Sequence, residues 1–230
     1  MDIAGVDGCR AGWLCVHRRD GAIDGEVFTT FQRLLHSLPS STLIAVDIPI
    51  GLPTSGERTC DRMARQLLGA PRASSVFPAP LLAVARETDY LAACAKHKNI
   101  DGRALSRQAF AILPKILEVN ELLWSNEVIR DRVKEIHPEV SFATWNSGRA
   151  MRHRKSEPVG AAERELLIDR EWPGQRADVM QRLGRVGYQR DDLNDAFAAL
   201  WSAARVARGT AKALGSTLRD ENGLPMQMWA

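Results

Sequence analysis

The chain has 230 residues, of which 45% are apolar and 26% charged, and this composition is typical of a globular protein that can bury a sizeable core. Its 31 basic and 28 acidic residues give a formal charge of +3, too small a surplus to indicate a nucleic-acid partner by itself. No apolar run approaches the ~18 to 20 residues of a membrane helix, and the amino terminus lacks a signal-peptide pattern, so we expect a cytoplasmic protein without a membrane partner. The 4 cysteines include no CxxC pair, which argues against structural zinc and favours reduced thiols.

The first part of the chain predicts three short strands, a helix and a fourth strand. Turn residues separate the apolar runs over residues 3–7, 12–17 and 25–30 so closely that antiparallel hairpins are expected. The stretch FTTFQRLLHSL predicts a helix capped by Thr29 or Thr30. STLIAVDIPIGLP is a continuous apolar run, typical of a strand buried on both faces. A strand, a helix of crossover length and another strand predict a parallel pair.

The rest of the chain is predicted to be mostly helical. The next strand and its exit are expected in VKEIHPEVSFATW, and an irregular loop in NSGRAMRHRKSEPVG. A turn at residues 221–223 can form a small hairpin. Because repeats and linkers are absent, we expect a single domain over residues 1–230 with a helical insertion over about 58–133. The expected helices cover residues 59–68, 80–98, 105–124 with a kink at Pro114, 161–169, 176–183 and 192–207.

Carboxylates stand at the ends of two predicted strands. Asp7 ends the first apolar run before Gly8, and Asp47 ends a later one before Pro49. If these strands are parallel neighbours, both side chains lie at one edge of the sheet, where α/β proteins bind ligands. Two adjacent carboxylates repel each other unless a cation, a proton or a basic side chain lies between them. A pair of aspartates therefore indicates a hard metal such as Mg²⁺ or Mn²⁺.

Further acids could complete this cluster. Glu139 follows the third candidate parallel strand in EIHPEVSF, and an alanine-rich helix that can lie close to the sheet begins with DDLNDAFAALW. Asp192 and Asp195 are three positions apart in that helix, so they share one face and compete for one role.

Each of these residues also has a structural alternative. Asp7 could be a turn residue that bonds its own backbone, and Asp191 or Asp192 could cap a helix. Glu139 could be a solvated residue at the end of a strand. His137 could be a metal ligand or a hydrogen-bonded structural histidine before Pro138.

Basic and hydroxyl residues in two segments are candidates for contacts with phosphate. Arginine forks suit phosphate oxygens and serine hydroxyls add donors, while the alternative for such residues is a solvated surface. Trp145, beside the second segment, could stack on a base, although a core position is the alternative for every tryptophan. The first segment contributes Arg58, Arg62, Arg65, Arg72, Ser74 and Ser75, and the second contributes Arg149, Arg152, His153, Arg154 and Lys155.

These residues resemble the predicted ribonuclease H-like nucleases grouped as domain of unknown function 429. The resemblance spans nearly the whole chain and is carried by GVDGCRAGW, AVDIPIGLP, RTCDRMARQLLG running into RASSVFPAP, EIHPEVSF, RKSEPVGAAERELL and DDLNDAFAALWSAAR. It implies an α/β ribonuclease H-like fold, with a mixed five-stranded sheet of three antiparallel strands then two parallel strands, flanked by helices. It also implies catalytic acids at Asp7, at Asp47, and at Asp192 or Asp195, with Glu139 as an additional acid.

The leading functional hypothesis is a metal-dependent nuclease or phosphodiester hydrolase, whose substrate could be DNA, RNA, a branched junction or a small phosphodiester. In this scheme Asp7 bridges two Mg²⁺ or Mn²⁺ ions, Asp47 and Asp195 or Asp192 each hold one ion, and Glu139 or His137 orients water. One alternative is a phosphotransferase or ATPase of the actin and sugar-kinase type, whose domain is usually repeated in a longer chain. The other is a non-catalytic module that binds a metal or nucleic acid.

Overall fold

The fold is built on a five-stranded mixed sheet with the strand order β3-β2-β1-β4-β5. The computed structural model describes residues 1–184 and 186–230. β1 (Ile3–Cys9), β2 (Gly12–Arg19) and β3 (Ala22–Phe28) are antiparallel to one another. β4 (Leu43–Val46) lies parallel to β1, and β5 (Val133–Glu135) lies parallel to β4. The expected α/β sheet of three antiparallel and two parallel strands is therefore confirmed.

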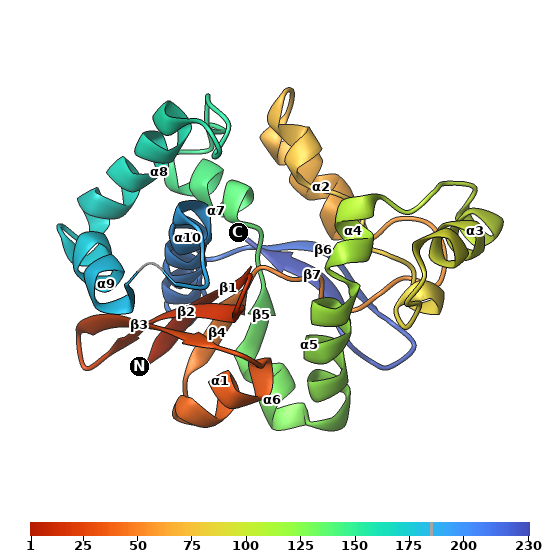
Figure 1. Ribbon diagram of the computed structural model, residues 1–230, viewed down its shortest axis with the longest axis horizontal. Helices are drawn as coiled ribbons and strands as arrows, with labels where there is room; N and C mark the ends of the chain where they lie inside the picture. The colour runs from red at the N-terminus through yellow and green to blue at the C-terminus, as the bar shows by residue number, and fades with distance from the viewer. Residues whose placement is uncertain (185) are drawn as a thin grey trace.

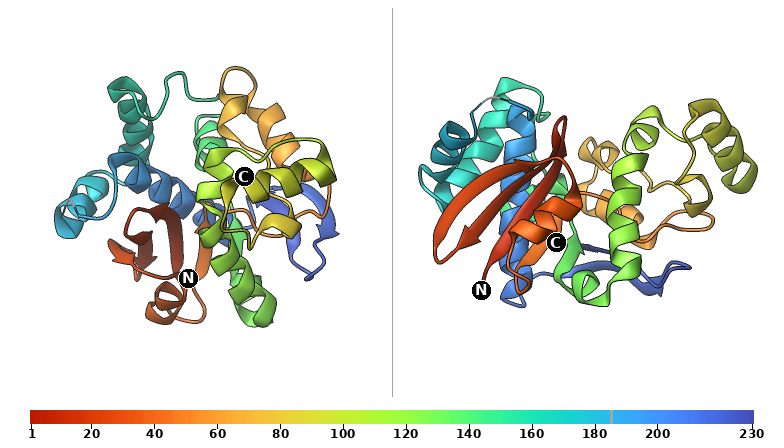
Figure 2. Two further views of the ribbon diagram at one scale, coloured as in Figure 1. Left: turned by 45° about the vertical axis from the view of Figure 1, so that its right-hand side comes forward. Right: turned by 60° about the horizontal axis from the view of Figure 1, so that its bottom comes forward.

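Helices cover both faces of this sheet (Figures 1 and 2). α1 (Phe31–Ser37) begins after Thr30, whose side chain accepts a hydrogen bond from the Arg33 amide at 3.2 Å, so the predicted cap is confirmed. α1 packs with α5 (Leu113–Ser125) against one face. α10 (Arg190–Ala207) packs against the other.

α10 lies directly against the backbone of β1. A Cβ atom added at Gly5 would lie 2.0 Å from the Leu200 amide nitrogen and 2.2 Å from the Ala196 carbonyl oxygen. The absence of a side chain at Gly5, together with the alanines of the helix, therefore permits this close approach. It brings the first turns of α10 toward the end of β1 at which Asp7 lies.

The connection between β4 and β5 is helical, with two departures from the predicted bounds. The helix predicted over residues 80–98 begins only at Tyr90, because Asp89 caps it by accepting a hydrogen bond from the Ala92 amide at 2.8 Å. The helix predicted over 105–124 is two helices, since Pro114 in the first turn starts a new one. The elements are α2 (Thr59–Leu68), as predicted, then η1 (Arg72–Ser75), η2 (Leu82–Val84), α3 (Tyr90–Asp101), α4 (Arg107–Ala111), α5 and α6 (Glu127–Arg132).

The remaining elements follow β5 in the chain. The expected exit of the strand after residue 137 is instead α7 (Pro138–Trp145), because Pro138 suits the first helical position. α8 (Pro158–Glu171) and α9 (Gln175–Leu183) follow, both close to their predicted positions. β6 (Ala213–Arg219) and β7 (Pro225–Trp229) form the predicted terminal hairpin, which packs on α2 (Figure 2). None of the helices in residues 1–184 and 186–230 is long and apolar enough to cross a membrane.

Candidate functional site

Asp7 and Asp47 come from two adjacent parallel strands, as predicted, although β1 continues two residues beyond Asp7 to Cys9. Val6 of β1 pairs with Val46 of β4, and the Asp47 amide continues this pairing by donating to the Val6 carbonyl oxygen at 3.0 Å. Side chains alternate between the faces of a strand, and Ile3 of β1 packs in the core cluster on the α10 side. Asp7 is four positions further along and therefore faces α10.

The two candidate acids of α10 have different surroundings. Asp192 closes a capping box, since its Oδ2 accepts a hydrogen bond from the Gln189 amide at 2.8 Å. Asp195 is only 1% exposed, and its Oδ2 accepts a hydrogen bond from Lys155 Nζ at 2.6 Å. Asp192 therefore caps the amino terminus of α10, which was one of its two predicted roles. Asp195 is the acid of this helix that is directed at the sheet.

A cavity of about 320 Å³ lies beside these acids and collects most of the predicted site residues. Its size suits a small ligand or one unit of a polymer. Its acidic part is lined by Asp47, Glu139 and Asp195, with His137 beside them. Its basic and hydroxyl part is lined by Arg72, Ser74, Ser75, Arg154 and Lys155. The sequence separates these two groups widely, and the fold brings them to one place.

Burial and mutual repulsion shift the pKa values of the acids upward. Burial raises the pKa of Asp47 to about 7, with Lys155 opposing the shift and the charge of Glu139 adding to it. Burial likewise raises the pKa of Asp195 to about 7, again opposed by Lys155. The pKa of Asp7 is raised well above its usual range by burial and by the charges of Asp195 and Asp47. These carboxylates are therefore close enough for their charges to interact.

Three buried atoms around the cavity have no hydrogen-bond partner within the described residues: Asp195 Oδ1, Glu139 Oε2 and His137 Nδ1. The other Glu139 oxygen accepts from Arg164 at 2.6 Å. His137 Nε2 donates to the Ser75 carbonyl oxygen at 3.2 Å, so Nδ1 of the neutral ring is left as an acceptor. Burial lowers the pKa of His137, which keeps the ring neutral. Buried acceptors without donors fit a bound cation, and the carboxylate oxygens among them suit Mg²⁺ or Mn²⁺.

Arg58 does not reach the cavity, so its predicted role in substrate binding is wrong. The residue is 3% exposed, and its guanidinium donates to Asp61 Oδ1 and to Glu135 Oε1, both at 2.6 Å. It also donates to the Ile50 carbonyl oxygen at 3.0 Å. The sequence placed Arg58 in a Gly/Pro-rich loop and gave no sign that two buried acids would surround it.

Two residues of the predicted basic loop also lie elsewhere. Arg152 lines a separate hollow with Arg149, and neither lines the cavity that holds the acids. Trp145 stacks on Trp201 with ring centroids 4.9 Å apart and on Phe142 at 6.1 Å. Trp145 is therefore part of the aromatic core, the alternative that the sequence left open.

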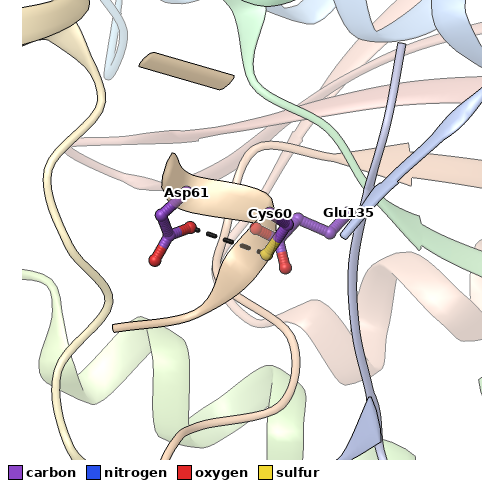
Figure 3. Close-up of side chains that lie close together, drawn as sticks. All are labelled: Cys60, Asp61 and Glu135. Carbon is purple, nitrogen blue, oxygen red and sulfur yellow. Dashed lines mark hydrogen bonds between the residues drawn. The ribbon is translucent and has the colours of Figure 1, made fainter. Parts of the chain in front are cut away.

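A second group of potential metal ligands lies next to the Arg58 guanidinium. Cys60, Asp61 and Glu135 each offer one ligand atom, all within 4.8 Å of one another (Figure 3). The three residues are buried, and burial raises the pKa of the Cys60 thiol to about 12. This geometry could bind a metal ion. However, the Arg58 guanidinium already supplies a positive charge to both carboxylates.

Sequence reasoning missed several residues that shape the cavity. Arg164, fully buried in α8, holds Glu139 in place. Phe77 and Gln108 line the wall, although neither stands in a pattern typical of a site. For Arg164 a signal existed, since the arginine lies on the apolar face of the GAAERELLI helix.

The fold and the cavity define an α/β protein with a carboxylate-rich pocket at the ends of its parallel strands. The chain belongs to the family described as protein of unknown function (DUF429), whose profile matches residues 5–218. No curated protein and no solved structure matches it.

Proposed function

We propose that the protein is a metal-dependent phosphodiester hydrolase, with a nucleic acid as its substrate and Mg²⁺ or Mn²⁺ as its cofactor. One observation carries this proposal: a single cavity is lined both by Asp195 and Glu139, which have unpaired buried acceptors, and by the basic residues Arg72 and Arg154. A divalent ion between acids and a phosphate bound by arginines are the two requirements of such a reaction. The ribonuclease H-like assignment of the fold and the cytoplasmic location belong to the same proposal.

The acids would form the metal-binding part of the site. Asp7, Asp47 and Asp195 would hold the ion, and burial, together with the charges of neighbouring acids, raises the pKa of each of them. When bound, a divalent ion lowers the pKa of a coordinated water and neutralises charge on the phosphate oxygens. Glu139 is fixed by Arg164 on one oxygen and keeps the other for a ligand or a water.

The opposite wall would bind the substrate phosphate. Arg72 Nε is buried and has no partner among the described residues, so the guanidinium retains a donor for a phosphate oxygen. Ser74 and Ser75 lie in the same short helix η1 and add hydroxyl donors. Arg154 comes from the loop before α8. The substrate phosphate would then lie between cations on one side and the metal-binding acids on the other.

The test is a hydrolysis screen with Mn²⁺ and with Mg²⁺ on single-stranded, duplex and branched nucleic acids and on a small chromogenic phosphodiester. We expect metal-dependent cleavage that Asp7→Asn and Asp47→Asn abolish and that Asp169→Asn, a change at an exposed aspartate of α8, leaves intact. Arg72→Gln should raise KM more than it lowers kcat. The proposal fails if no substrate is cleaved, or if cleavage persists in Asp47→Asn.

A further inference from the structure

Lys155 places its ammonium group within the acid cluster. Its Nζ lies 2.6 Å from Asp195 Oδ2 and 3.6 Å from Asp191 Oδ2. The residue comes from the loop between α7 and α8 and lines the same cavity as Asp47. Its charge acts on Asp7 and Asp47 as well as on Asp195.

Among the four acids of the cluster, Asp7, Asp47, Glu139 and Asp195, two have a basic ion-pair partner within the described residues and two do not. Lys155 is the ion-pair partner of Asp195, and Arg164 is that of Glu139. The side chains of Asp7 and Asp47 have no hydrogen-bond or ion-pair partner in the described parts of the chain. When both are ionised, these two carboxylates match the charge of one divalent cation, and a bound ion would replace the protons that their raised pKa values favour in the metal-free protein.

Two buried oxygen atoms of the cavity acids remain free to act as ligands. Asp195 uses Oδ2 for Lys155 and keeps Oδ1 unpartnered, and Glu139 uses Oε1 for Arg164 and keeps Oε2 unpartnered. A two-ion site places its ions about 3.5–4 Å apart. In the arrangement expected from the sequence, Asp195 is one of the candidates to hold the second ion. The lysine ammonium already holds one oxygen of the buried Asp195.

We propose that the Lys155 ammonium supplies the second positive charge of this site, so that the cavity binds one divalent cation instead of the two expected from the sequence. This inference rests on the proposed metal-dependent function, but it concerns the number of ions and the position of the lysine, which are measurable without turnover. The site would then present a metal ion and an ammonium group, on neighbouring oxygens of Asp195, to the same substrate phosphate.

The first test is calorimetric titration of the protein with MnCl₂ in the absence of substrate. The wild type should bind one Mn²⁺ per chain. In Lys155→Met the loss of the ammonium should open the second position, so that a second ion binds or the affinity for the first rises by roughly tenfold or more. Lys98→Met, at an exposed lysine of α3, is the matched control and should behave as the wild type does. Two ions in the wild type, or no Mn²⁺ binding at all, would overturn the inference.

The second test follows the lysine itself by acetylation and mass spectrometry, with and without MnCl₂, and it requires no variant to fold. If Lys155 stays beside Asp195 when the ion binds, Mn²⁺ should leave its acetylation unchanged or lower it relative to Lys98. Increased acetylation of Lys155 would mean that the ion displaces the ammonium, and the inference would then be wrong. One bound ion with a retained lysine but no hydrolysis of any substrate would contradict the proposed function and leave this inference standing.

Discussion

At the residue scale, burial of the Asp47 carboxylate lowers the stability of the metal-free protein at neutral pH. Burial raises its pKa to about 7 from the ordinary value of 3.8. The unfolded chain therefore loses this proton near pH 4, whereas the folded protein keeps it until about pH 7. Since the unfolded state binds fewer protons across this window, the contribution of Asp47 to stability falls as the pH rises from about 4 to 7.

Asp47→Asn should consequently stabilise the metal-free protein at pH 7.5, because the amide has no charge to bury. The gain should shrink as the pH is lowered toward about 4, where the native aspartate is protonated in both states. Thermal unfolding of the wild type and the variant across this pH range measures the difference. Asp169→Asn, with an exposed side chain, should show no such pH-dependent gain. A loss of stability at pH 7.5 would mean that a basic partner compensates the Asp47 carboxylate.

A second residue-scale prediction concerns Arg58, which separates two buried acids from one another. Arg58→Met would leave Glu135 and Asp61 without their ion-pair partner in a buried position, at a cost of about 3–5 kcal/mol. Urea unfolding of Arg58→Met measures this cost. Arg62→Met, at an exposed position of the same helix, should change stability by less than about 0.5 kcal/mol. Similar stabilities for the two variants would show that the buried cluster needs no arginine.

At the scale of elements, the contact between β1 and α10 decides where the acids meet. Gly5→Ala places a methyl group against the backbone of α10, which cannot move aside as a flexible side chain can. We expect a loss of stability of about 1–3 kcal/mol or more. In Gly8→Ala the nearest atom to the new methyl group is Cδ of the flexible Lys115 side chain at 3.2 Å, so the loss should be much smaller. Equal losses in denaturant unfolding would refute the close approach.

Patterns in the sequence predicted the elements with regular periodicity. They failed where a single residue, such as a proline, started a new helix. The strands and α2 follow from apolar spacing. The position of α2 agrees with the structure, whereas β1 and β2 each extend two residues beyond their predicted ends and β3 spans Ala22–Phe28 instead of 25–30. Pro114 and Pro138 were visible, but whether a proline kinks a helix or starts one depends on the tertiary surroundings. The C-terminal hairpin followed from its turn residues.

The part of the candidate site that could be predicted from the sequence is the pair of acids that stand at the ends of apolar runs. Asp7 and Asp47 have this signature, and a parallel pairing then brings them together. The contacts of Lys155 and Arg58 were not predictable, because pairing across 40 residues or 77 residues depends on packing that periodicity does not encode. The local sequence around a basic loop residue does not show whether the residue binds phosphate, pairs with buried acids or lies in the core.

For the whole molecule, metal binding should be linked to stability and to pH. An ion that binds only the folded state stabilises it by about 2.7 kcal/mol at a concentration 100 times the Kd. Because the pKa values of Asp47 and Asp195 are raised to about 7, protons compete with the ion below that pH. Addition of MnCl₂ should therefore raise Tm more at pH 8 than at pH 6. An equal shift at both pH values would mean that these acids do not bind the ion.

The described residues offer two buried places for a cation, and the proposed function requires the metal to bind in the cavity. A crystal soaked in MnCl₂, with the metal located by its anomalous scattering, distinguishes them directly. We predict one manganese peak in the cavity beside Asp47, Glu139 and Asp195, with Lys155 still paired to Asp195. A peak at Cys60, Asp61 and Glu135 with the cavity empty, or no ordered manganese at either place, would contradict the account.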